Sequence, residues 1–181
     1  SGFTFGLRAS TEPVTGISLE WGISNPTDQY VFRIDAGQLY IVRRSTIPLE
    51  NSALLRSGLT IADQTRVASG DPFDNETYWT IKIPRDKFNG DPLNSNGPSG
   101  YLLNPEKVTM YKIEFGWYGA IGARFYAYIP TDNGDARWVV IHTLVIENSL
   151  GSPCLQDSYF RFKYALNVQN TGDVRTPQYI Y

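Results

Sequence analysis

The chain has 181 residues and a formal net charge of −2, a length that favours one domain able to bury a core without covalent staples. Its single cysteine, Cys154, excludes an internal disulfide framework, and we expect an inert thiol, with pairing between chains as the alternative. No run of basic residues indicates nucleic-acid binding, and no stretch approaches the roughly 18 apolar residues of a membrane span.

Aromatic residues make up 14% of the chain, and 16 glycines and 11 prolines punctuate it. Rings pack well on pleated sheet faces, and glycine and proline form turns. We therefore expect one all-β domain over residues 1–181, an antiparallel two-sheet sandwich with long ordered loops and an extended tail over residues 170–181. The chain opens with Ser1 rather than Met, so we expect a processed chain or part of a longer protein.

In the first half of the chain, a period-2 alternation sets Tyr30, Phe32 and Ile34 against Val31 and Arg33, and the run 39–42, followed by the polar residues 43–45, resumes after a turn. The short turn at residues 35–37 contains glycine, so the two runs predict a hairpin. Asn51–Arg56 is the best helix candidate, although it is short. Residues 86–100 are too rich in glycine, proline and asparagine for regular structure and predict a long ordered loop.

In the second half, alternation recurs over residues 111–117, 123–129 and 160–168. Asn133-Gly134 predicts a type I′ hairpin turn, because both residues tolerate positive φ angles. Residues 138–146 are nearly all apolar, which predicts a strand covered on both faces. The whole pattern indicates about eight to ten strands, as in a sandwich.

Catalytic groups are scarce in this sequence. The only histidine, His142, lies within a predicted strand, and we interpret it as a structural residue rather than a general base. Glu114 has no acidic partner two or four positions away, whereas glycoside hydrolysis requires two carboxylates. One histidine and one cysteine also exclude the usual zinc ligand sets. We expect no catalytic residue, no metal and no cofactor.

Exposed rings could form a platform for sugars, since aromatic faces stack on flat apolar surfaces. The candidates are Trp79, Trp117, Tyr118 and Tyr126. A sandwich core or a subunit interface uses the same residue types, and we favour that interpretation.

An ordered series of motifs runs from residue 21 to residue 130. The segments are Trp21-Gly22-Ile23, residues 30–35, residues 39–45, residues 88–93, residues 97–103, residues 111–119 and residues 122–125. This series resembles a concanavalin-like jelly-roll domain that recurs in structural proteins of tailed bacteriophages, particularly marine ones. The resemblance implies a place on the virion, as a head, tail or baseplate component, and carries no catalytic residue.

A virion building block usually assembles with copies of itself, so we expect a homo-oligomer, with a trimer as one candidate, alongside contacts to other virion proteins. The tail ends in aromatic residues, and we expect Pro177, Tyr179 and Tyr181 to contact a neighbouring subunit. The alternative is a lectin-like module that attaches the particle to a host surface glycan. A glycosidase or lyase is the third hypothesis, disfavoured by the missing carboxylate pair.

Overall fold

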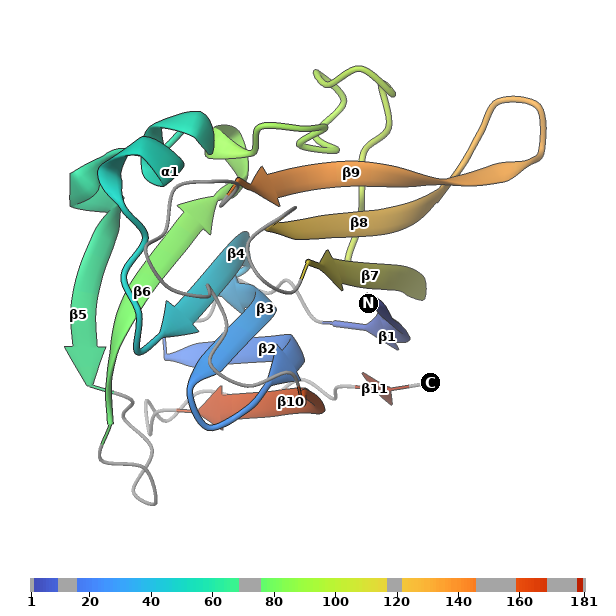
Figure 1. Ribbon diagram of the computed structural model, residues 1–181. Helices are drawn as coiled ribbons and strands as arrows, with labels where there is room; N and C mark the ends of the chain where they lie inside the picture. The colour runs from blue at the N-terminus through green and yellow to red at the C-terminus, as the bar shows by residue number, and fades with distance from the viewer. Residues whose placement is uncertain are drawn as a thin grey trace.

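Two antiparallel β-sheets pack face to face in the computed structural model of the protein (Figure 1). The structure describes residues 2–9, 16–68, 76–116, 122–145, 159–168 and 179–180. Every strand pairing among them is antiparallel. The prediction of an all-β, two-sheet antiparallel sandwich is therefore confirmed.

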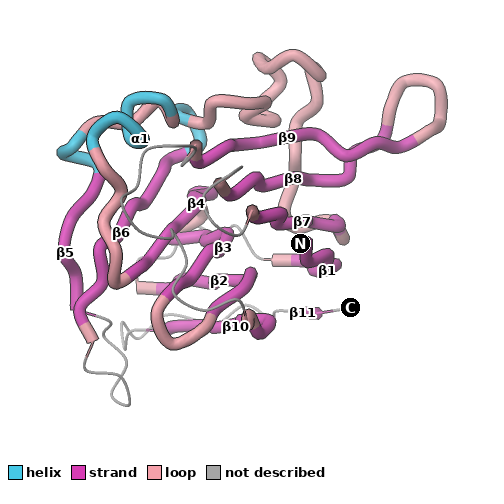
Figure 2. Tube along the Cα trace, viewed as in Figure 1, coloured by secondary structure: helices cyan, strands magenta, loops and turns pink. Residues whose placement is uncertain are grey.

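The five-stranded sheet contains, in spatial order, β11 (Tyr179–Ile180), β1 (Gly2–Arg8), β7 (Thr109–Phe115), β8 (Ala123–Pro130) and β9 (Ala136–Leu144). The six-stranded sheet contains β10 (Arg161–Val168), β2 (Ile17–Ser24), β3 (Asp28–Asp35), β4 (Gln38–Ser45), β6 (Thr77–Pro84) and β5 (Gln64–Ala68). The short helices are α1 (Asn51–Arg56), η1 (Ile61–Asp63) and η2 (Arg85–Lys87). They gather at one end of the sandwich (Figure 2), and the predicted helix at Asn51–Arg56 is confirmed.

The core lies between the sheets and is rich in aromatic rings. Trp21 of β2 lies 5.2 Å from Tyr111 of β7, between ring centroids, and Phe32 of β3 meets Phe125 of β8 edge-on at 5.4 Å. All four side chains are fully buried. Because side chains alternate along a strand, every residue next to one of these points away from the core. The alternation therefore determines which residues each sheet presents on its outer face.

The β3–β4 hairpin turns through Ala36 and Gly37, which have φ angles of 47° and 80°. Two consecutive positive φ angles define the type I′ turn that suits a twisted hairpin, so the predicted hairpin is confirmed. The β8–β9 connection differs from the predicted type I′ turn. Gly134 has a positive φ, but Asn133 does not. Pairing of Pro130 with Ala136 leaves five residues in this loop, and a loop of that length is usually built around a type I turn.

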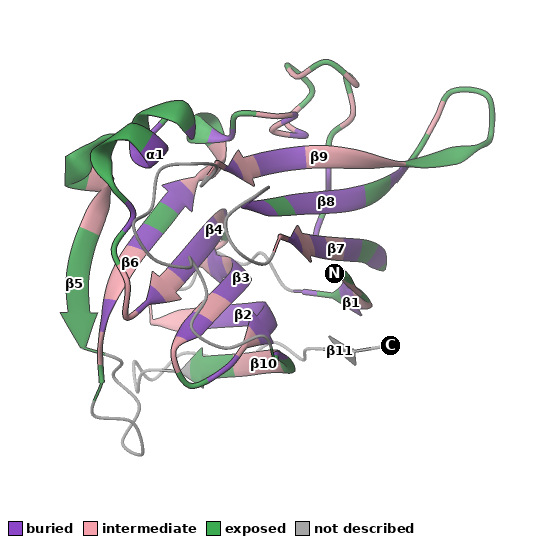
Figure 3. Ribbon diagram, in the orientation of Figure 1, coloured by how far each residue is buried: buried purple, intermediate pink, exposed green. Residues whose placement is uncertain are grey.

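The prediction that residues 138–146 are covered on both faces is wrong for the part that the structure describes. β9 is an edge strand, and its outward residues Trp138 and Val140 are only half-buried. The tip of the β8–β9 hairpin, residues 132–137, is exposed and projects beyond the sheet (Figure 3). A bulge between Phe125 and Tyr126 shifts the β8–β9 register, so that Trp138 and Val140 share the outer face with Tyr126.

Candidate interaction surface

The outer face of the five-stranded sheet combines aromatic, apolar and charged side chains. We call it the aromatic face, and it comprises Met110, Lys112, Glu114, Arg124, Tyr126, Tyr128 and Trp138. Strand register arranges these side chains in rows across β7, β8 and β9. One row is apolar, the next is mixed, and the third is charged, so the face changes character from one side to the other.

The apolar row consists of Met110, Tyr128 and Trp138. Tyr128 pairs with Trp138, and Met110 precedes Tyr111, whose partner is Ala127, so that Met110 is the cross-strand neighbour of Tyr128. The rings of Tyr128 and Trp138 lie 5.0 Å apart at an angle of 48°. Met110 is 44% exposed and Tyr128 is 39% exposed. Large apolar groups are therefore held side by side at the surface.

The mixed row is centred on Lys112, whose ammonium nitrogen lies 4.3 Å from the Tyr126 ring centroid and 4.7 Å from that of Trp138. Such cation–π contacts hold the lysine flat over both rings. The Tyr126 hydroxyl donates a 2.6 Å hydrogen bond to Glu114, and Lys112 lies 3.2 Å from the same carboxylate. The bond from Tyr126 lowers the pKa of Glu114, despite the opposing effect of burial, and Lys112 lowers it further. Glu114 is thus an ionised surface group with defined partners.

The predicted sugar platform is not assembled by the residues that the structure describes. Tyr126 is 9% exposed and lies beneath Lys112, so its ring presents no open face. Trp79 belongs to the other sheet, where the guanidinium of Arg66 lies 5.5 Å from its ring centroid. Trp117 and Tyr118 lie outside the described residues. Tyr126 and Trp79 are therefore members of two separate surfaces.

The predicted contact of the C-terminal tail with a neighbouring subunit remains a prediction. Within the chain, Tyr179 and Ile180 pair with Arg8 and Leu7 of β1 and form the edge strand β11. Pro177 and Tyr181 lie outside the described residues.

The long loop after η2 covers part of the exposed edge of β9. Backbone amides of Gly90 and Asp91 donate to Ile141 and Val140, at 3.0 Å and 2.9 Å. A Cβ on Gly90 would overlap the Val140 carbonyl, so this close approach requires glycine. The predicted irregular loop is confirmed over residues 88–100, whereas residues 86 and 87 belong to η2. The loop closes an edge that could otherwise pair with another chain.

The loop is held in shape by Asp91, which is 4% exposed. Its carboxylate accepts hydrogen bonds from the backbone amides of Leu93 and Ser99, at 2.9 Å and 2.8 Å. Burial would raise the pKa of Asp91, but the side chain of Ser99 and the two backbone amides lower it. A Cβ on Gly97 would overlap the same carboxylate. Asp91 thus holds the segment from residue 91 to residue 99 in shape through internal hydrogen bonds.

His142 is fully buried on β9 and packs against Phe88, with 6.0 Å between ring centroids. Its Nδ1 accepts a 3.1 Å hydrogen bond from the backbone amide of Asn89, and its Nε2 has no partner among the described residues. Burial lowers the pKa of His142 to about 4. The imidazole is therefore neutral, and it fixes the loop to the strand.

No group of three or more histidine, cysteine or acidic residues suited to a metal ion occurs within the described ranges. No helix in this part of the chain is long and apolar enough to span a membrane.

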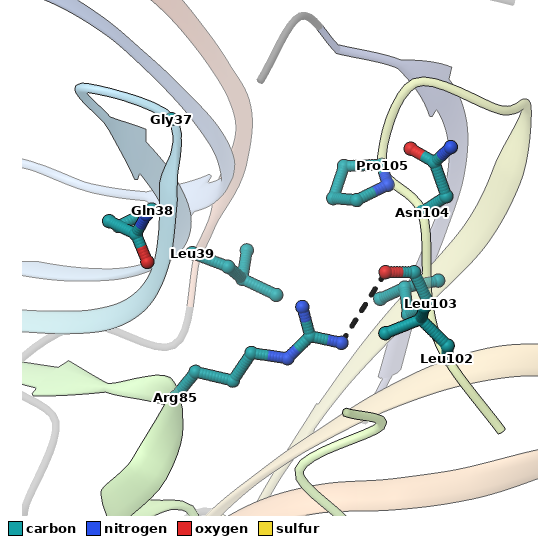
Figure 4. Close-up of a pocket in the computed structure, with 8 residues that line it drawn as sticks. All are labelled: Gly37, Gln38, Leu39, Arg85, Leu102, Leu103, Asn104 and Pro105. Atoms are coloured by element: carbon teal, nitrogen blue, oxygen red, sulfur yellow. Dashed lines mark hydrogen bonds between the residues drawn. The ribbon is translucent and has the colours of Figure 1, made fainter. Parts of the chain in front are cut away.

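A pocket of about 310 Å³ lies between the β3–β4 turn and residues 102–105 (Figure 4). Arg85 reaches into it, and its guanidinium donates to the carbonyls of Pro92, Leu93 and Leu103. Burial lowers the pKa of this arginine. Because its Nε and Nη2 donate to three backbone carbonyls, Arg85 connects the loop segments around the pocket.

Comparison of the chain with known protein families, curated proteins and solved structures finds no match.

Five members of the aromatic face are not identified as interaction residues from the sequence: Met110, Lys112, Arg124, Tyr128 and Trp138. The apolar run over residues 138–146 does not reveal which face Trp138 occupies, because a bulge in the pairing of β9 with β8 decides it. The one available signal was that Lys112, Glu114, Tyr126 and Tyr128 all occupy outward positions on adjoining strands.

Proposed function

We propose that this chain is a non-enzymatic structural domain of a tailed-bacteriophage virion, and that it acts through protein–protein contacts at its aromatic face. The place on a virion rests on the resemblance of residues 21–130 to the phage jelly-roll domain. The mode of action rests on the physical properties of the surface.

The observation that carries the proposal is the exposed row of Met110, Tyr128 and Trp138 on an open sheet face. Aromatic residues and methionine are enriched in protein interfaces, where they bury large apolar areas. The third row of the same face places Glu114 opposite Arg124. A row that carries both signs can pair with itself when a second copy docks about a two-fold axis.

The segments that carry the resemblance act as scaffold. Trp21 fills the core, while Gly90, Asp91 and Gly97 shape the loop that covers β9. Such roles suit a rigid building block whose sheet edges are protected from pairing with other chains. They supply no group that performs chemistry on a ligand.

A host-glycan module remains the second candidate, supported by one observation. The Tyr128 ring is partly exposed beside Trp138, and two adjacent tilted rings can contact the flat side of a sugar. Lys112 already lies over the Trp138 ring, which leaves Tyr128 as the open face.

The test is the solution mass of the chain by light scattering across a range of concentrations. We expect an oligomer that persists on dilution, and we expect Tyr128→Glu to dissociate it by placing a charge in the interface. Leu55→Glu is the matched control, because Leu55 is 63% exposed on α1, outside the aromatic face.

A chain that is monomeric at every concentration would overturn self-association through this face. Equal dissociation by both variants would overturn its assignment to the aromatic face. In either case a glycan array, with Tyr128→Ala as the comparison, tests the second candidate.

A further inference from the structure

The outer face of the six-stranded sheet carries an excess of positive charge. Its outward charged residues are Arg161 and Lys163 on β10, Glu20 on β2, Arg33 and Asp35 on β3, Arg44 on β4 and Lys82 on β6. We call this the cationic face. Five cations and two carboxylates give these strand residues a net charge of +3, although the whole chain has a net charge of −2.

Glu20 is the centre of this face and is only 7% exposed in its side chain. Its Oε1 accepts hydrogen bonds from Arg33, at 2.6 Å, and from Arg44, and its Oε2 accepts a second bond from Arg44 at 3.0 Å. Lys163 lies 3.1 Å from Oε2. Burial would raise the pKa of Glu20, but Arg44, Lys163 and Arg33 together lower it to about 2. One ionised carboxylate therefore holds three cations together.

Asp35 extends the network along β3. It accepts from Arg33 at 3.3 Å and from Lys82 at 2.8 Å, so it too is shared between cations. Arg161 makes no ion pair among the described residues and lies 5.7 Å from the Tyr159 ring centroid. Like charges fixed this close repel one another, and an anionic ligand would relieve the repulsion.

The spacing of the lysines suits an extended polymer. Register places Lys163, Gly22, Val31, Val42 and Lys82 in one row across five strands. Four interstrand steps of about 4.8 Å separate the two lysines by about 19 Å, too far for one small anion to bridge. Each lysine has spare donor capacity, since Lys82 is 41% exposed and Lys163 uses two acceptors, Glu20 and Gln29.

The polar side chains that lie between the cations favour a partner rich in hydroxyl groups. Gln29, Ser24 and Thr80 are outward neighbours of Arg44 and Arg161 across the sheet. None of the outward residues on β2, β3, β4 and β6 is a large, exposed apolar residue. Protein interfaces have an aromatic core and few lysines, and sites for single-stranded nucleic acid add rings on which bases stack.

We propose that the cationic face binds an acidic polysaccharide, whose carboxylate or sulfate groups pair with Lys163, Lys82 and Arg161. This surface lies on the opposite sheet from the aromatic face. The proposal therefore does not depend on the one made for assembly.

The experiment measures binding of the chain to dextran sulfate, polygalacturonate and neutral dextran by calorimetry at several salt concentrations. We expect both charged polymers, but not dextran, to bind, with an affinity that falls steadily as salt rises. Comparison of the two polymers separates sulfate from carboxylate recognition. Lys163→Gln with Lys82→Gln should weaken binding by about tenfold.

Lys87→Gln with Lys107→Gln is the matched control, because it removes the same charge outside the cationic face; it should leave affinity within about twofold. If the Lys163→Gln with Lys82→Gln variant is unstable, Arg161→Gln provides a second test and should also weaken binding to the charged polymers. No binding to either charged polymer at low salt would overturn the proposal. An equal loss of affinity in the control variant would also overturn the proposal. So would tighter binding to a single-stranded oligonucleotide than to both charged polymers.

Discussion

The side-chain amide of Asn89 pairs with the backbone of Thr143 as a neighbouring strand would. Asn89 Nδ2 donates to the Thr143 carbonyl, and the Thr143 amide donates to Asn89 Oδ1, both at 2.8 Å. Nδ2 also donates to the carbonyl of Ser57 at 3.2 Å. The Asn89 side chain thus supplies hydrogen-bond partners to the backbone at the edge of β9 and connects this strand to the end of α1.

Asn89→Ala should destabilise the fold by about 1 kcal/mol, because Thr143 regains only water as a partner. The loss should be local, so hydrogen exchange at the Thr143 amide should accelerate more than exchange elsewhere in β9. Asn96→Ala, at an exposed asparagine of the same loop, is the control. Unchanged protection of Thr143 in Asn89→Ala would contradict this role.

Stability should fall as the pH drops from about 6.5 to 4 because of His142. Burial lowers its folded-state pKa to about 4, while the unfolded chain takes up the proton near 6.5. The unfolded state therefore binds more protons in this window, and about 3 kcal/mol of stability is lost across it.

An NMR titration of the folded chain should give a midpoint near 4 for His142, the only histidine present. In urea unfolding, His142→Leu should flatten the stability profile between pH 6.5 and 5, above the range of ordinary carboxylates. A folded-state midpoint close to 6.5 would exclude this explanation.

Glu20→Gln should destabilise the chain by about 3 kcal/mol, because it leaves Arg33, Arg44 and Lys163 close together without their shared carboxylate. Repulsion among the cations should be screened by salt, so thermal unfolding should show a larger gain from added sodium chloride in the variant than in the native chain. Glu50→Gln, at an exposed glutamate, should change neither value. An equal salt response in all three proteins would exclude a charge network.

Tyr126→Phe should raise the pKa of Glu114 toward its ordinary value, because the hydroxyl that donates to the carboxylate is lost. A carboxyl-detected NMR titration measures this pKa directly. Tyr128→Phe removes a hydroxyl from the same face and should leave Glu114 unchanged. If both variants shifted Glu114 alike, the specific bond from Tyr126 would not be the cause.

Local sequence patterns predicted much of the fold. Alternation over residues 30–34 and 123–129 predicted strands with the correct inward residues, and the glycine at position 37 predicted the hairpin. The β8–β9 turn was mistaken because its conformation depends on where pairing stops, at Pro130 and Ala136, which is a tertiary property.

The surfaces were harder to predict, because each depends on strands distant in the sequence. Lys163 meets Glu20 only through the pairing of β10 with β2. Glu20 lies between Leu19 and Trp21 and looks like any outward residue of a strand. Tyr126 was recognised as a candidate, but its partners on β7 and β9 become visible only once register is known.

The pairing of β10 with β2 also has a consequence for biosynthesis. Residues 161–168 form eight paired positions with residues 17–24. The six-stranded sheet therefore lacks its edge strand β10 until translation has passed residue 168. Until then, β2 presents a bare backbone edge beside the Trp21 core. Contacts so distant in sequence also slow folding. We therefore expect nascent chains of this protein to be vulnerable to mispairing on the ribosome, where a chaperone that shields β2 would raise the yield.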